Sequence, residues 1–150
     1  MSKRFENYYN ISRHLALSSH MRYKHSTLVI YRNNVLCVGI NSQRCYARRR
    51  LIPSMHSEIQ AIINASNKIT KPIIVDIFVS RFTKDMKPKV SRPCNLCLDF
   101  VSNAENVTVR RVYYFNRNNN LVYENLRDME HVYNSAGYRN LSKCTNIYIK

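Results

Sequence analysis

HSE at residues 56–58 and PCNLC at residues 93–97 are the two segments of this 150-residue chain that carry its candidate metal ligands. A helix is expected to begin near Ser54, because a Pro-Ser pair followed by an apolar run is typical of a helix start. A second, short helix is expected over 95–102, directly after the proline of PCNLC. Each segment therefore lies near the beginning of a predicted helix.

The flanking sequence predicts an α/β fold with a mixed sheet. Residues 26–31 and 35–40 are β-rich runs separated by Arg-Asn-Asn, which indicates a hairpin because asparagine tolerates positive φ. Residues 73–79 form an almost continuous apolar run, as expected of a central strand buried on both faces. This order of elements implies a sheet covered by helices. The other expected elements are a helix over 5–20, strands over 107–115 and 121–124, a helix over 126–134 and a last strand over 145–149.

Composition limits the class of protein. The chain has 45% hydrophobic and 22% charged residues, which is ordinary for a globular protein, and its length suits a single domain over residues 1–150. It contains no apolar stretch near the ~18 residues that a membrane span needs, and its N-terminus lacks the apolar core of a secretory signal. We therefore expect a cytoplasmic or nuclear protein that is not secreted, has no membrane partner and keeps its five cysteines reduced.

Three side chains of the two segments, His56, Cys94 and Cys97, are candidate metal ligands. Taken alone, a CxxC motif also suits a redox pair, half of a structural zinc site, or chance. A closed structural zinc site needs four protein ligands, usually from a second pair of cysteines or histidines, and the sequence offers no such pair. Three ligands leave one tetrahedral position open, which is typical of a catalytic zinc.

Glu58, two residues after His56, is the candidate acid–base group. Side chains at i and i+2 of a helix diverge by about 200°, but a long carboxylate in the first turn can still reach a site beyond the helix end. A carboxylate beside metal-activated water can take a proton from it and return the proton to a leaving group. The full pattern HxE…PCxxC is the signature of zinc nucleobase deaminases.

The run from His25 to Met129 resembles the cytidine and deoxycytidylate deaminase superfamily. Besides the metal motif, GINS at residues 39–42 is similar to the stretch that ends the second strand in deoxycytidylate and tRNA-adenosine deaminases. Ser57 stands where family members usually carry alanine. The resemblance implies a three-layer fold with a mixed five-stranded sheet flanked by helices, and one zinc ion per chain with a bound water.

The resemblance also implies roles for single residues. In this family hydroxide on zinc attacks C4 of cytosine or C6 of adenine, and Glu58 would relay protons to the departing ammonia. Asn41 is expected to contact the sugar or the base, the backbone N–H of Ser57 to meet the base carbonyl, and the Arg92 carbonyl to accept from the exocyclic amine. Relatives commonly assemble as dimers or higher oligomers, so a homo-oligomer is expected.

The net charge of +15, from 24 Lys+Arg against 9 Asp+Glu, favours an anionic substrate. Two basic segments lead into the metal motifs and would border the mouth of the site if both helices converge on zinc. Arginine binds phosphate oxygens bidentately, so we expect a cytosine nucleotide such as CMP or dCMP. A nucleic acid, tRNA or single-stranded DNA, is the alternative, with Tyr46 and Phe82 as stacking platforms. The basic residues are Arg44, Arg48, Arg49 and Arg50 before HSE, and Lys84, Lys87, Lys89 and Arg92 before PCNLC.

Two non-enzymatic interpretations and one question of topology stay open. A deaminase fold can persist as a basic nucleic-acid-binding module, which predicts loss of Glu58 or of a ligand, and neither is lost. A structural zinc protein needs a fourth ligand, for which the distant His131 and Cys144 are the candidates. A short turn over 116–120 would make the last two strands antiparallel, as in nucleoside cytidine deaminases, whereas deoxycytidylate and polynucleotide deaminases usually have parallel strands there.

Overall fold

The computed structural model describes residues 1–47 and 50–130, with the backbone alone described over 43–47 and 50–54. Its helices are α1 (Lys3–Ala16), α2 (Ser57–Lys68), α3 (Asn95–Ser102) and the single 3-10 turn η1 (Leu126–Asp128). Its strands are β1 (Lys24–Tyr31), β2 (Asn34–Ile40), β3 (Ser42–Ala47), β4 (Arg50–Met55), β5 (Ile73–Phe82), β6 (Pro88–Lys89), β7 (Val107–Phe115) and β8 (Leu121–Asn125).

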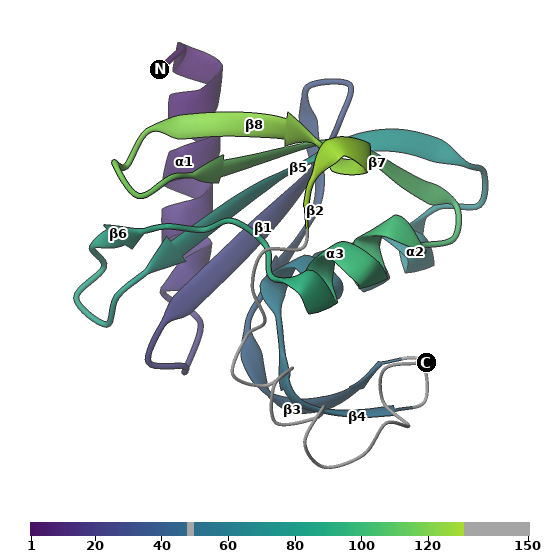
Figure 1. The fold of residues 1–150 in the computed structure, drawn as a ribbon, viewed down its shortest axis with the longest axis horizontal. Helices are drawn as coiled ribbons and strands as arrows, with labels where there is room; N and C mark the ends of the chain where they lie inside the picture. The colour runs from purple at the N-terminus through teal and green to yellow at the C-terminus, as the bar shows by residue number, and fades with distance from the viewer. Residues whose placement is uncertain (48–49, 131–150) are drawn as a thin grey trace.

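A mixed sheet forms the centre of the fold (Figure 1). Its strands follow the order β2-β1-β5-β7-β8, and β6 pairs with the end of β5. β5 and β7 are parallel, whereas β1 is antiparallel to β2 and to β5. The expected five-stranded mixed sheet is confirmed, with a two-residue sixth strand in addition. β8 is antiparallel to β7, so the last two strands form the hairpin arrangement.

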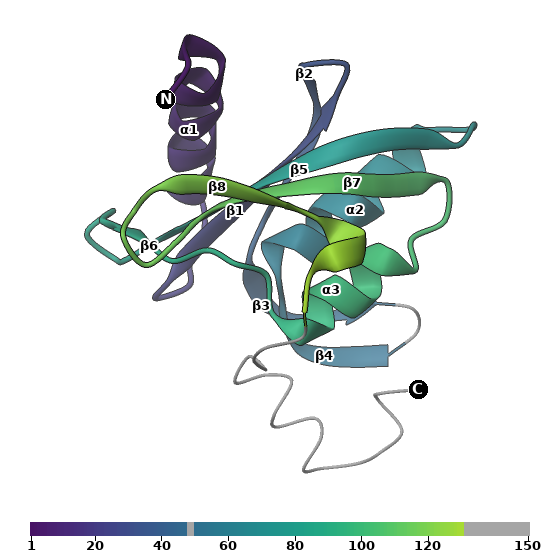
Figure 2. The same cartoon turned by 45° about the horizontal axis from the view of Figure 1, so that its top comes forward.

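Helices cover both faces of this sheet, which gives the three expected layers (Figures 1 and 2). α1 packs on one face around the buried side chains of Tyr8, Leu28 and Phe78. α2 and α3 lie together on the other face, where Ile62 and Leu98 join the main apolar core. Because alternate residues of a strand point to opposite faces, β1 and β5 contribute to both cores.

The first turn of α2 touches the backbone of β2 at Gly39. A Cβ atom on Gly39 would lie 2.4 Å from the backbone oxygen of Ser57 and 2.4 Å from the backbone nitrogen of Ala61. These distances are far inside van der Waals contact. Glycine alone has no Cβ and lets a helix approach a strand this closely. The helix that follows HSE is therefore fixed directly on the strand.

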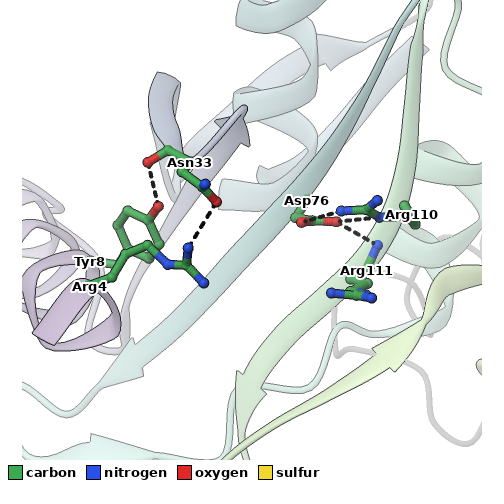
Figure 3. A network of polar contacts seen from close by, with 6 residues as sticks. All are labelled: Arg4, Tyr8, Asn33, Asp76, Arg110 and Arg111. Atoms are coloured by element: carbon green, nitrogen blue, oxygen red, sulfur yellow. Dashed lines mark hydrogen bonds and ion pairs between the residues drawn. The ribbon is translucent and has the colours of Figure 1, made fainter. Parts of the chain in front are cut away.

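Polar contacts fix α1 on the sheet and join β7 to β5 within it (Figure 3). Tyr8 Oη donates to the carbonyl of Asn33 at 2.6 Å, and Arg4 donates to the side-chain oxygen of Asn33 at 3.1 Å. Both bonds tie α1 to the turn between β1 and β2. Asp76 accepts two hydrogen bonds from Arg110, at 3.1 and 3.3 Å, where the register between β5 and β7 shifts. These contacts hold the framework on which the site is built.

The helix expected to begin near Ser54 begins at Ser57 instead. Residues 50–55 form β4, which pairs with β3 in a separate two-stranded antiparallel ladder. Pro53 is compatible with this strand because each strand of a two-stranded ladder has one side without a partner, and there a missing N–H is tolerated. The Pro-Ser pair therefore precedes the helix by a few residues and does not start it.

Two other boundaries differ from expectation, and one expected strand is not described. The helix expected over 5–20 ends at Ala16, because the chain turns there and Ser19 hydrogen-bonds to the end of the neighbouring strand at Asn41. The helix expected over 126–134 is the single turn η1 within the described residues. The strand expected over 145–149 lies outside them. Within 1–47 and 50–130, no helix is long and apolar enough to cross a membrane.

Candidate active site

The three candidate ligands lie at the first residues of two adjacent helices. His56 is the N-cap residue of α2, and Cys94 is the N-cap residue of α3, with Cys97 in the first turn of that helix. Neither cap residue uses its side chain to bond the helix backbone. α2 and α3 pack against each other on one face of the sheet (Figure 1). The imidazole and the two thiols consequently meet, although they are far apart in sequence.

The separations of the three donor atoms suit a tetrahedral zinc ion. His56 Nδ1 lies 3.1 Å from Cys97 Sγ and 3.4 Å from Cys94 Sγ, and the two sulfurs are 3.7 Å apart. Usual zinc bond lengths at tetrahedral angles require about 3.8 Å between two sulfurs and about 3.6 Å between nitrogen and sulfur. Among the described residues, this group has these three members. A three-ligand His/Cys/Cys set fits a catalytic zinc.

Hydrogen bonds and burial set the protonation of the three ligands. The hydrogen bond with Cys97 lowers the pKa of Cys94 to about 4; burial opposes this shift, and the hydrogen bond with His56 adds to it. Burial raises the pKa of Cys97 well above its usual range. Burial lowers the pKa of His56, but its hydrogen bond with Cys94 and nearby negative charge raise it overall. A metal ion that binds both sulfurs would displace the proton of Cys97.

Glu58 lies beside this cluster and is nearly inaccessible to solvent, with 3% of its surface exposed. Its Oε1 accepts a hydrogen bond of 2.8 Å from the Ser57 hydroxyl. Its carboxylate also interacts with the Cys97 thiol, and its charge acts on the imidazole of His56. Glu58 is therefore a buried carboxylate next to the three donor atoms and outside the ligand set.

The N-termini of α2 and α3 both face the cluster. The first backbone N–H groups of a helix have no partner within the helix and carry partial positive charge. This charge stabilises anions, which here are the Cys94 thiolate and the Glu58 carboxylate. The arrangement can hold a cation among negative donors, with the Glu58 carboxyl group beside it.

Asn41 closes a loop next to the site. Its Oδ1 accepts hydrogen bonds from the Ser19 hydroxyl at 2.6 Å and from the His25 backbone N–H at 2.9 Å. Its Nδ2 donates to the carbonyl of Tyr23 at 2.7 Å. The sequence gives no sign of these contacts, which position residues 19–25. The contact of Asn41 with a sugar or a base stays a prediction.

The Arg92 side chain belongs to a polar network that joins the residues before Cys94 to β8. Its Nε donates to Glu124 at 3.3 Å, and its Nη2 donates to the carbonyl of Glu130 at 2.8 Å. Tyr114 Oη donates to the same Glu124 oxygen at 2.6 Å. The guanidinium is thus held by this network. The contact of the Arg92 carbonyl with an exocyclic amine stays a prediction.

The basic and aromatic residues expected at the mouth of the site have mixed outcomes. Phe82 is fully buried and packs on Tyr9 of α1 at 5.9 Å between ring centroids, so its expected role as a stacking platform is wrong. On the segment after β5, the side chains of Lys84, Lys87 and Lys89 are exposed. The side chains of Arg44, Tyr46, Arg48, Arg49 and Arg50, together with His131 and Cys144, lie outside the described residues.

His25 of β1 is a neighbour of the site that motif reasoning misses. Burial lowers its pKa to about 4; the charge of Glu58 acts against this shift, and the charges of Arg81 and His56 add to it. All three groups therefore lie within electrostatic range of the His25 imidazole. The signal that could have found it is strand alternation, because His25 shares a face of β1 with Thr27, which hydrogen-bonds to α2.

Comparison with known proteins supports the architecture. No protein-family model matches the chain, and no curated protein matches it. Among solved structures, the cytidine deaminase from Burkholderia pseudomallei is similar, with a TM-score of 0.58 and 13% sequence identity over 85% of this chain and 95% of that chain. The fold is cytidine deaminase-like. At 13% identity this likeness describes the architecture alone, because one fold hosts many chemistries.

Proposed function

We propose that this protein is a zinc-dependent hydrolytic deaminase that acts on a cytosine-containing nucleotide of the CMP or dCMP type. One observation carries the proposal. His56, Cys94 and Cys97 place their donor atoms within about 0.5 Å of tetrahedral zinc spacing, with the buried carboxylate of Glu58 beside them. A redox pair would not need the imidazole, and a structural site would not need the carboxylate.

Zinc bound to this cluster would act as a Lewis acid and lower the pKa of a coordinated water from about 15.7 to about 7. Glu58 would accept a proton of the attacking water and relay protons within the site. The two water protons end on N3 of the base and on the exocyclic nitrogen, which leaves as ammonia while C4 gains the oxygen. The Ser57 hydroxyl donates to one carboxylate oxygen of Glu58, so the carboxylate is oriented before substrate arrives. Burial of Glu58 excludes bulk solvent from this transfer.

Substrate contacts form the finer part of the proposal. The backbone N–H of Ser57 lies in the first turn of α2, where backbone donors have no partner within the helix, and is available to the base carbonyl. The Arg92 carbonyl would accept from the exocyclic amine, and Asn41 would contact the sugar. These three contacts would fix the base with C4 next to the metal.

The test is zinc content and ammonia release of the wild type and of Glu58→Gln. We expect one zinc per chain in both proteins. We expect ammonia release by the variant to fall at least about 100-fold, because general acid–base catalysis contributes roughly 10²–10⁴-fold. Glu105→Gln removes a carboxylate from the surface and serves as the matched control. Equal activity in wild type and Glu58→Gln would remove Glu58 from the mechanism.

The charge of +15 supports a second candidate substrate, a polynucleotide. A panel of cytidine, deoxycytidine, CMP, dCMP, tRNA and single-stranded DNA separates the two. A nucleotide deaminase would prefer CMP or dCMP and respond weakly to salt, whereas binding to a strand would weaken steeply as salt rises. Preference for unphosphorylated nucleosides would contradict the phosphorylated substrate class.

A further inference from the structure

Arg81 lies near the end of β5, directly opposite His25 of β1 in the antiparallel register. The next residue, Phe82, packs on α1. Val79, two residues before Arg81, joins the core under α2 and α3. Because alternate residues of a strand face opposite sides, the Arg81 side chain leaves the sheet on the face that carries the site.

On this face, the strand register places Arg81 one residue pair beyond the Thr27–Val79 pair, which contacts the start of α2 next to Glu58. Thr27 is paired with Val79, and its hydroxyl bonds to Ser57 at the start of α2. The next pair on the same face is His25 with Arg81, about 7 Å further along the strands. His25 lies within electrostatic range of both Arg81 and Glu58. Arg81 is thus a cation at the rim of the site.

The guanidinium of Arg81 is held in place yet has hydrogen-bonding capacity left. It stacks over the ring of Tyr23 at 4.5 Å, and the carbonyl of Tyr23 is fixed by Asn41. Its Nε is buried and has no hydrogen-bond partner. Within the described part of the chain, no carboxylate forms an ion pair with it.

We propose that Arg81, stacked on Tyr23, is the subsite that binds the phosphate of the nucleotide substrate. The inference rests on the proposed deaminase function and assigns its phosphate specificity to one residue. A buried donor without a partner is costly, and a planar guanidinium matches two oxygens of a phosphate. The ribose separates base and phosphate in a nucleotide, so a cation at the rim suits a base held at the metal. The phosphate can belong to a free nucleotide or to a strand.

The experiment measures binding by titration calorimetry, with the zinc-loaded Glu58→Gln protein to prevent turnover. CMP, cytidine and a short cytosine-containing single-stranded oligonucleotide are titrated into it and into Glu58→Gln/Arg81→Gln. We expect the ratio of CMP to cytidine affinity to fall about 10- to 100-fold in the double variant, as charge-assisted hydrogen bonds predict. A matching loss for the oligonucleotide instead of CMP would identify a strand phosphate as the ligand.

Arg32→Gln is the matched control, because Arg32 also stacks on a tyrosine, Tyr31 at 5.0 Å, at the opposite end of β1. We expect its affinity ratio to equal that of the parent. Arg81→Lys keeps the charge without the fork and should recover part of the lost ratio, which also covers the case in which Arg81→Gln fails to fold. An unchanged ratio of CMP to cytidine affinity in the Arg81 variants, together with an unchanged affinity for the oligonucleotide, overturns the inference alone. Wild type that turns over no cytosine compound overturns the proposed function as well.

Discussion

Thr27 of β1 and Ser57 of α2 share a hydrogen bond of 2.9 Å between their side-chain oxygens, at a point that solvent does not reach. The Ser57 hydroxyl has one hydrogen, and it donates to Glu58 Oε1 at 2.8 Å. Thr27 must therefore be the donor in its bond with Ser57. A chain of two hydrogen bonds thus runs from the central sheet to the proposed catalytic carboxylate.

Ser57→Ala would interrupt this chain. We expect a loss of about 1–3 kcal/mol in the free energy of unfolding, because the buried Thr27 hydroxyl loses its partner. Adding Thr27→Val should recover part of the loss, since the double variant leaves no unpaired hydroxyl. Urea unfolding of the two single variants and the double variant checks this. Strictly additive losses would show that the two side chains are not coupled.

Gly39→Ala would push α2 away from β2. The added Cβ meets backbone atoms of Ser57 and Ala61 that no side-chain rotation can move, so we expect a loss of about 3 kcal/mol or more. Because His56 caps the same helix, affinity for zinc should fall too. Val38→Ala, on the opposite face of β2, is the control. It should lower stability and leave the zinc affinity as it is, as measured by competition with a chelator.

Glu124→Gln would weaken the network that holds Arg92 and Tyr114. We expect a loss of about 1–3 kcal/mol, because a charged acceptor shared by two donors becomes neutral. Asp128→Asn breaks the exposed pair with Arg127 and should change stability little, since such pairs contribute about 0–1 kcal/mol. Thermal unfolding compares the two variants. Equal small losses would mean that the Arg92 network does not contribute to the fold.

His25 should make the protein less stable in weak acid. Its pKa is lowered from the usual 6.5 to about 4, so the unfolded chain takes up a proton below pH 6.5 while the folded protein takes it up near pH 4. Stability from this group is present above pH 6.5 and is lost as the pH falls toward 4, by as much as about 3 kcal/mol. The groups that face His25 are Glu58, Arg81 and His56.

Urea unfolding of metal-free wild type and His25→Gln at several pH values tests this expectation. The variant has no imidazole at this position, so the stability difference between the two proteins should change between pH 6.5 and 4. Curves that run parallel over this range would show that His25 titrates normally in the folded protein.

Local patterns predicted most of the sheet. The turn between β1 and β2 was predicted from Arg-Asn-Asn, and Arg32 and Asn33 do adopt positive φ, at 51° and 66°. The bounds of α3 and β7 were predicted correctly, because each is an apolar run with clear ends. The β3–β4 ladder was not predicted, because its arginines and Pro53 do not show the alternation of a half-buried strand.

In the candidate site, too, some residues were predicted from local motifs and others depend on how distant segments pair. The types and spacing of His56, Cys94 and Cys97 were enough to predict that they meet, since their chemistry allows few alternatives. The positions of His25 and Arg81 could not be predicted from motifs, because they depend on the register of β1 against β5. The internal bonds of Asn41 likewise depend on how residues 19–25 fold back on the strand end.

His56 and Cys94 are 38 residues apart, and the segment between them contains α2 and the central strand β5. An ion held by both would close this segment into a loop, as a covalent cross-link does. A permanent cross-link of that span stabilises a fold by about 4 kcal/mol through the entropy of the unfolded chain. The supply of zinc in the cell would then affect the stability of the folded protein as well as its catalytic rate.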